Sequence, residues 1–413
     1  MSIYSVLSRC MGILLAVLAA MPETPAAELT LAEAERLALE HAPWLQHHRS
    51  NADAAAERAV YEGRLPDPQL TLGLANVPTD SYRLNQEDMT MTVVGVRQAF
   101  PPGKTLKLKT ERAEKELARE QARVLMEQRN LLRQVRQAWL ELYFQEQSLR
   151  TLDESRRLAR KQLGATEARY RAAQESQQSV LRSRQALARL DERAPMIRAQ
   201  ILRLQAQLAR WIGEIAYSNL PAELPALPVA PVEFDYTRHP EWTATRTMLD
   251  EARVEVEIAR QEYKPGMMLD VSYGFRRPMP DGTERPDLLS AMVTFDLPVF
   301  RDKRQDRKLA EKQTMEAGAR FELDDKRREL ESMDSSLRAE LDGLSEREQI
   351  FSERLLPATR REAQVTVTGF ARDQSEYRDA LMKSLDTEIE YLRLRVDRAK
   401  AQTELLYLTG EQP

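Results

Sequence analysis

The spacing of apolar residues predicts long helices over most of the chain. Apolar residues recur at heptad spacing over about 104–168 and 302–367, and only Pro357 interrupts the second run. Each run could form a helix of about 65 residues, or ~100 Å at 1.5 Å per residue. Shorter segments at about 176–212 and 376–409 carry the same spacing. A heptad pattern sustained over such lengths is typical of coiled-coil packing.

A period of two replaces the helical period at four short segments. Apolar and smaller or polar residues alternate there, which predicts strands at about 69–76, 89–100, 267–275 and 288–297. A helix over about Leu31 to Arg64 precedes the first strand. It should end at Leu65-Pro66-Asp67-Pro68, because proline has no amide proton and disfavours helix in the residue before it.

The two halves of the chain are copies of one unit. Identical residues recur at a constant spacing of 197, and a spacing of 200 relates Tyr170 to Phe370. Such repetition indicates a tandem duplication. Four prolines mark the predicted junctions between strands and helices in the two copies, Pro68 and Pro101 in the first and Pro265 and Pro298 in the second.

We therefore expect a first structural repeat at 28–213, an inter-repeat linker or equatorial segment at 214–239, and a second repeat at 240–413. Each repeat should contain a helix, a β-hairpin, a very long helix and a shorter helix. The first and last helices of a repeat together are about as long as the long one, so they could flank it end to end.

The N-terminus has the pattern of a cleaved signal peptide, expected at 1–27. An apolar run from Met11 to Met21 follows Arg9 and precedes Thr24-Pro25-Ala26-Ala27. The run is shorter than the ~20 residues that a membrane-spanning helix needs. Cleavage would remove Cys10, the only cysteine, and with it any thiolate or disulfide chemistry. A soluble cytoplasmic protein with a chance apolar start is the alternative.

Composition and motifs do not indicate an enzyme or a nucleic-acid-binding protein. Charged residues make up 31% of the chain, aromatic residues 6%, and the net charge is −4, without the basic excess that nucleic acid requires. The four histidines have no zinc-ligand spacing, and the chain lacks a phosphate-binding glycine loop. We therefore predict no catalytic, cofactor-binding or metal-binding residues.

The two hairpins need a larger sheet if they lie in a membrane. Open strand edges would leave amides unsatisfied in hydrocarbon, so only a closed barrel spans it. Four strands are too few, but three subunits would supply twelve, an even number within the known range. The alternative is a pair of soluble edge hairpins packed on helices.

Taken together, residues 29–410 resemble the TolC family of outer-membrane efflux proteins. The resemblance is carried by the opening Leu29-Thr30-Leu31-Ala32-Glu33-Ala34, the duplicated Pro-hairpin-Pro units, Leu355-Leu356-Pro357 and the closing Leu405-Leu406-Tyr407-Leu408-Thr409-Gly410. It implies a mainly α protein with a transmembrane β part: a homotrimer whose 12-stranded outer-membrane barrel continues as a 12-helix periplasmic α-barrel.

The same resemblance implies a passive exit duct in contact with outer-membrane lipid. The expected partners are a periplasmic adaptor (membrane fusion) protein and an inner-membrane pump of the resistance-nodulation-division type. Residues 77–101 look like the branch of the family that serves heavy-metal exporters. A soluble periplasmic coiled-coil adaptor or scaffold remains the alternative function, although adaptors place their helical hairpins between small β domains.

The helix turns at the far end of the shaft are the candidate gate. Family members carry an aromatic residue at these turns, kept here as Tyr170 and Phe370, but Ala173 and Asp373 replace the usual glycine. Asp379 matches one of the aspartates that constrict the entrance, whereas Met382 and Ser375 depart from the pattern. The hypothesis is a charged ring around the aperture, formed by Arg372, Asp373, Glu376 and Asp379. A solvated helix end without a special role is the alternative.

Overall fold

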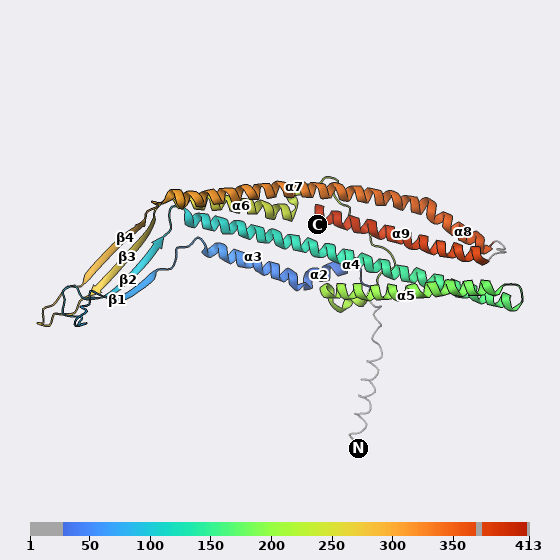
Figure 1. Ribbon diagram of the computed structural model, residues 1–413, viewed down its shortest axis with the longest axis horizontal. Helices are drawn as coiled ribbons and strands as arrows, with labels where there is room; N and C mark the ends of the chain where they lie inside the picture. The colour runs from blue at the N-terminus through green and yellow to red at the C-terminus, as the bar shows by residue number, and fades with distance from the viewer. Residues whose placement is uncertain (1–27, 369–373, 411–413) are drawn as a thin grey trace, which may run out of the picture.

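The protein is a long shaft of helices with a small sheet at one end. A computed structural model describes residues 28–368 and 374–410, without the side chains of residues 365–368 and 374–378. Figure 1 shows the sheet at one end and the ends of several helices at the other. The predicted signal peptide at 1–27 lies outside the described residues.

Each half of the chain supplies helices and one hairpin. The first half contains α2 (Leu31–His41), α3 (Pro43–Tyr61), β1 (Gln69–Ala75), β2 (Met91–Phe100), α4 (Thr105–Arg171) and α5 (Gln177–Ile212). The second contains α6 (Pro240–Gln261), β3 (Gly266–Phe275), β4 (Leu288–Asp296), α7 (Gln305–Ile350), α8 (Leu356–Thr368) and α9 (Gln374–Thr409). Short 3-10 turns lie at Gly213–Tyr217, Tyr236–Arg238 and Arg301–Lys303.

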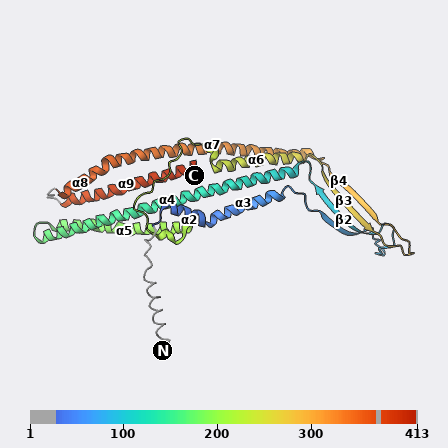
Figure 2. The same cartoon turned by 180° about the vertical axis from the view of Figure 1, so that it is seen from behind.

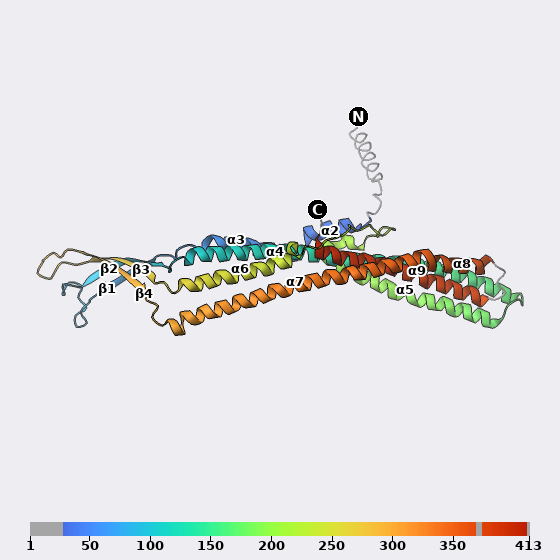
Figure 3. The same ribbon diagram turned by 90° about the horizontal axis from the view of Figure 1, so that it is seen from above.

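The shorter helices flank the longer ones end to end. The 67 residues of α4 give it a length of ~100 Å. Helices α3 and α5 pack along one side of α4, and α6 and α9 fill the space between α4 and α7 (Figures 1 and 3). The long helix of the first half, expected over about 104–168, is α4. None of the described helices is long and apolar enough to cross a membrane.

The first helix is not continuous from Leu31 to Arg64, as the sequence analysis expected. The chain leaves the helical conformation at Ala42, where ψ is 110°, and α3 begins at Pro43. Proline suits the first position of a helix and disfavours helix in the residue before it, so Pro43 separates α2 from α3. Pro240, the duplicate of Pro43, likewise begins α6.

The helix expected over 302–367 is also interrupted. Helix α7 begins at Gln305, and a π-helical turn at Phe351–Leu355 separates it from α8. Pro357 has no amide proton to donate to the preceding turn. The chain compensates with a wider turn, in which the amide of Leu356 donates to the carbonyl oxygen of Phe351. In contrast, α5 runs through Pro195 as one helix.

The two hairpins form one antiparallel sheet in the order β1-β2-β3-β4. They join through β2 and β3, where Val94 pairs with Tyr273 and Val96 pairs with Val271. Figures 1 and 2 show that the four strands extend beyond the shaft and that no helix covers them. The two hairpins of the duplication therefore form a single surface.

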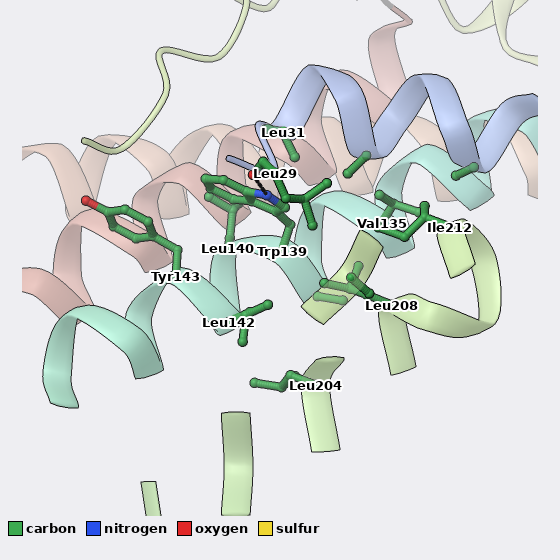
Figure 4. Packing of buried hydrophobic residues seen from close by; sticks show 14 of the residues in the cluster. Leu29, Leu31, Val135, Trp139, Leu140, Leu142, Tyr143, Leu204, Leu208 and Ile212 are labelled. Carbon is green, nitrogen blue, oxygen red and sulfur yellow. Dashed lines mark hydrogen bonds between the residues drawn. The ribbon is translucent and has the colours of Figure 1, made fainter. Parts of the chain in front are cut away.

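The main hydrophobic core lies in the middle of the shaft rather than at the sheet. Trp139 and Leu140 of α4 are fully buried there together with Leu29 and with Leu208 of α5 (Figure 4). The segment between the repeats crosses this region, because the Tyr143 hydroxyl donates to the carbonyl oxygen of Ala222 at 3.0 Å. This core ties the start of the chain and the linker to the middle of α4.

Candidate functional site

One face of the sheet is apolar and exposed. The strand register places leucine, valine and aromatic side chains of all four strands on this face. Leu72 is 68% exposed, Val96 49%, Tyr273 40% and Phe295 55%. Further members are Leu70, Leu74, Val94, Leu269, Val271, Phe275, Leu289 and Val293. An apolar surface of this extent is unusual for a soluble monomer and indicates contact with another protein or with lipid.

The opposite face of the sheet is mainly polar. It carries glycine, serine, threonine and charged side chains, among them Thr71, Ser272 and Thr294, and its apolar members include Val93, Leu288 and Met292. At its centre Arg97 of β2 donates to the carboxylate of Asp270 on β3 at 2.9 Å. One face rich in large apolar side chains and one that carries most of the polar ones is the pattern of strands that separate lipid from water.

The two outer strands of the sheet have unpaired edges. Within the described residues β1 pairs only with β2, and β4 pairs only with β3. Each edge therefore presents backbone amides and carbonyls that another strand could bind. Because β1 and β4 lie at opposite sides of the sheet, one copy of the chain can extend the sheet of another.

The four junction prolines lie where the sheet meets the shaft. Pro68 precedes β1, Pro101 follows β2, Pro265 precedes β3, and Pro298 lies shortly after β4. Proline has no amide proton to donate, so strand pairing does not continue through these positions. The prolines therefore mark the border between the two parts of the molecule.

The structure describes only part of the candidate gate. Tyr170 is 45% exposed in the last turn of α4. Phe370, Arg372 and Asp373 lie outside the described residues. Glu376 and Asp379 belong to α9, where the Asp379 side chain is exposed and that of Glu376 is not described. The charged ring therefore remains a proposal.

Ala173, at the turn between α4 and α5, has a left-handed backbone with φ of 55°. Its amide donates to the carbonyl oxygen of Tyr170 at 3.0 Å. A left-handed conformation is unfavourable for alanine because of its Cβ atom, and glycine is the residue that adopts it freely. The turn therefore places an alanine where glycine would be less strained.

Sequence reasoning did not find the ion pairs that join the two repeats inside the shaft. The carboxylate of Glu141 on α4 accepts hydrogen bonds from Arg393 at 2.8 Å and from Lys400, both on α9. Burial raises the pKa of Glu141, but the bond and charge of Lys400 and the charge of Arg393 lower it below its ordinary value. No local pattern could reveal these contacts, because Arg393 and Lys400 lie 252 and 259 residues after Glu141 in the chain.

A second polar cluster surrounds the start of α6. The carboxylate of Glu241 accepts hydrogen bonds from the Tyr407 hydroxyl at 3.0 Å and from the Lys326 amine at 3.1 Å. Burial and the nearby Glu241 carboxylate raise the pKa of Tyr407 to about 12. His239 is only 2% exposed, and its burial lowers its pKa to about 4. The sequence analysis noted His239 only as one of four histidines.

No group of three or more His, Cys, Asp or Glu side chains that could hold a metal ion is found among the described residues. Met89 is 53% exposed in the loop before β2. Met91 lies over Gly274 of β3, where a Cβ atom would clash with the Met91 sulfur. The described part of the chain therefore shows Met91 in a packing role.

Several solved structures share this architecture over nearly their whole length. The chain matches CusC, described in a study of transmembrane channel formation, with a TM-score of 0.78 and 12% identity, over 95% of this chain and 96% of that one. It matches the outer membrane protein VceC from Vibrio cholerae with a TM-score of 0.76 and 16% identity, over 92% and 96%. It matches the CmeC outer membrane channel from Campylobacter jejuni with a TM-score of 0.72 and 12% identity, over 95% and 90%.

The chain has the fold of the TolC-type outer-membrane channels. The resemblance inferred from the sequence is thereby confirmed for this fold. No family model matches the sequence, and no curated protein matches it either.

Proposed function

We propose that the protein is the outer-membrane exit duct of a tripartite efflux system. In this proposal three copies form a passive channel, which a periplasmic adaptor couples to an inner-membrane pump of the resistance-nodulation-division type. The sheet lies in the outer membrane, the shaft extends into the periplasm, and residues 1–27 act as the export signal. The TolC-type channel fold supports this role.

The observation that carries the proposal is the sheet with two different faces and two open edges. A lipid-facing barrel needs apolar side chains outside, polar side chains inside and no free strand edge. One chain meets the first two requirements and not the third. Three copies joined from β4 of one to β1 of the next would close a barrel of twelve strands.

The helical shaft has unpartnered edges at the same two sides as the sheet. On α7, Phe321 is 76% and Met315 56% exposed, and only two of its residues are buried. On α3, Val60 and Tyr61 are each 61% exposed. In a closed trimer, α7 of one copy would pack beside α3 and α5 of the next. That contact would cover these apolar side chains and close a ring of helices below the barrel.

Conductance across a planar lipid bilayer tests the proposal. The purified protein should insert and produce discrete steps of uniform size, because a closed barrel of fixed strand number has a fixed pore. Absence of steps from protein that is trimeric and folded would contradict the duct.

For the cargo, we propose heavy-metal cations. Support comes from the resemblance of residues 77–101 to the heavy-metal branch, now seen as a loop followed by β2. Deletion of the protein in its host should lower resistance to such cations and leave resistance to organic antibiotics unchanged. The opposite pattern would assign the duct to an organic cargo.

A further inference from the structure

Six basic side chains surround the place where the sheet meets the shaft. They lie at the beginnings of α4 and α7, and all six are exposed. We call this set the basic collar: Lys104, Lys107, Arg301, Lys303, Arg304 and Arg307.

The two halves of the chain contribute equivalent parts of the collar. Lys104 corresponds to Arg301 and Lys107 to Arg304, at the spacing of 197 residues that relates the junction prolines. Both halves therefore place two cations three residues apart just beyond the sheet. A single basic residue could be incidental, but the same pair at the same place in both copies requires an explanation.

The collar residues lack the acidic partners that neutralise cations lower in the shaft. None of the six forms an ion pair with another described residue. Arg301 donates only to the carbonyl oxygen of Pro298. In contrast, Arg112 pairs with Glu255 at 2.9 Å, and Arg119 pairs with Glu251 at 2.8 Å. The positive charge of the collar is thus left for something outside the chain, although the whole chain has a net charge of −4.

The basic residues of the collar do not stabilise α4 and α7, the helices at whose starts they lie. The positive end of the helix dipole lies at the N-terminus, so cations in the first turn are unfavourable there. The first turn of α4 contains no acidic residue to compensate, and the one in the first turn of α7, Asp306, accepts a hydrogen bond from the Tyr263 hydroxyl. Helix stability therefore does not explain why these positions are basic.

The apolar face of the sheet ends directly at the collar. The alternation that places Val293 and Phe295 on this face continues to Leu297 and Val299, which are 71% and 69% exposed. Phe300 is 74% exposed, and the next residue is Arg301. The surface thus changes from apolar side chains through an aromatic one to cations. Residue types follow this order at the border of a bilayer.

We propose that the basic collar binds the phosphate groups of anionic phospholipids in the periplasmic leaflet of the outer membrane. The inference rests on the proposed function, which places the sheet in that membrane. Strands β2, β3 and β4 have 10, 10 and 9 residues, which matches the ~9–11 residues of a tilted strand that crosses a bilayer. The collar then lies at the headgroups of one leaflet, and each phosphate contacts cations that have no partner in the chain. Basic clusters beside a membrane-spanning segment attract anionic lipid in this way.

Lipid enrichment around the purified trimer tests this inference. The protein is equilibrated with mixed micelles of phosphatidylcholine and phosphatidylglycerol, and the lipids that remain bound are counted by native mass spectrometry. The test variant carries Lys104→Gln, Lys107→Gln, Arg301→Gln and Arg304→Gln. A matched control carries Lys161→Gln and Arg182→Gln, two exposed cations far from the sheet.

Wild type and the control should enrich phosphatidylglycerol, and high salt should reduce the enrichment because it screens exposed charges. Each cation removed should weaken the preference roughly fivefold. Arg301→Lys with Arg304→Lys should retain most of it. Enrichment in the four-site variant equal to that of wild type would overturn the inference. Complete competition by millimolar inorganic phosphate would also overturn it, because the site would then select a free anion rather than a membrane lipid.

The inference and the proposed function fail in different ways. A four-site variant that conducts normally in a phosphatidylcholine bilayer and has lost its lipid preference supports both. Unchanged lipid preference with altered ion selectivity would place the collar inside the pore and refute only the lipid site. Absence of conductance in wild type in every lipid would refute the duct itself.

Discussion

The indole nitrogen of Trp139 donates a hydrogen bond of 3.0 Å to the carbonyl oxygen of Leu29, 110 residues earlier in the chain. The amide of Leu29 in turn donates to the carbonyl oxygen of Asn219 at 2.9 Å. These two bonds join the beginning of the described chain, the middle of α4 and the segment between the repeats. Both Leu29 and Trp139 are fully buried.

Trp139→Ala should therefore destabilise the protein strongly. Removal of a buried indole leaves a cavity and an unsatisfied carbonyl, at a cost of about 3–5 kcal/mol. Trp44, which is 52% exposed, provides the control, and Trp44→Ala should cost no more than about 1 kcal/mol. Chemical denaturation of the detergent-solubilised protein measures both, and equal losses would contradict the central position of Trp139.

The two faces of the sheet should respond differently to charge. Leu72→Lys places a cation on the apolar face, where it should cost ~2–4 kcal/mol near the middle of a bilayer and reduce the trimer recovered from outer membranes. Thr71→Lys, one residue away on the polar face, should leave that yield nearly unchanged. Quantitative immunoblotting of outer-membrane fractions compares the two, and equal yields would show that the faces are assigned wrongly.

Ala173→Gly should stabilise the protein. Alanine with φ of 55° carries steric strain that glycine lacks, so relief should raise stability by about 1 kcal/mol after the loss of backbone entropy is subtracted. The neighbouring Ala172 has φ of −83°, and Ala172→Gly should be neutral or destabilising. Differential scanning calorimetry ranks the variants, and a lower melting temperature for Ala173→Gly than for wild type would contradict the strain.

His239 should make the shaft sensitive to acid. Its pKa in the folded protein is about 4, below the ordinary histidine value of 6.5, so the unfolded chain binds the proton first as the pH falls. Stability is therefore greatest above about pH 6.5 and should decline by about 2 kcal/mol between pH 7 and pH 5 through this group. His239→Asn should flatten that part of the stability profile, whereas the exposed His47→Asn should not. A profile that is unchanged in His239→Asn would assign the acid sensitivity elsewhere.

Removal of the proposed charged ring at the aperture should make the channel leak to small solutes. Glu376→Ala combined with Asp379→Ala should raise the passive entry of small hydrophilic solutes, because the turns would lose the ion pairs that hold them together. The control is Glu390→Ala, which removes an exposed carboxylate farther along α9. If an intact trimer of the double variant excludes the solutes as wild type does, these carboxylates are not part of the gate.

Local sequence chemistry predicts the elements of this fold better than it predicts their contacts. The alternation around Leu72 and the prolines at the junctions indicate strands without reference to any other part of the chain. The break before Pro43 could also have been predicted, since Pro240 begins a helix at the equivalent position. The wider turn at Phe351–Leu355 could not, because it depends on how the chain compensates for Pro357.

The polar contacts within the shaft could not be predicted from local sequence. Glu141 gives no local signal of its partnership with Arg393 and Lys400, because the duplication brings together residues that are distant in the chain. The collar was present in the sequence as two basic segments. Its role could be inferred only from the structure. There Arg301 follows the apolar face directly and has no acidic partner among the described residues.

The most direct test of the account is the mass of the protein recovered from outer membranes in detergent, corrected for bound detergent. Closure of the β1 and β4 edges into one barrel predicts a particle of three chains that stays intact on dilution. A monomer that remains soluble after the detergent is removed would contradict the shared barrel and favour the periplasmic scaffold.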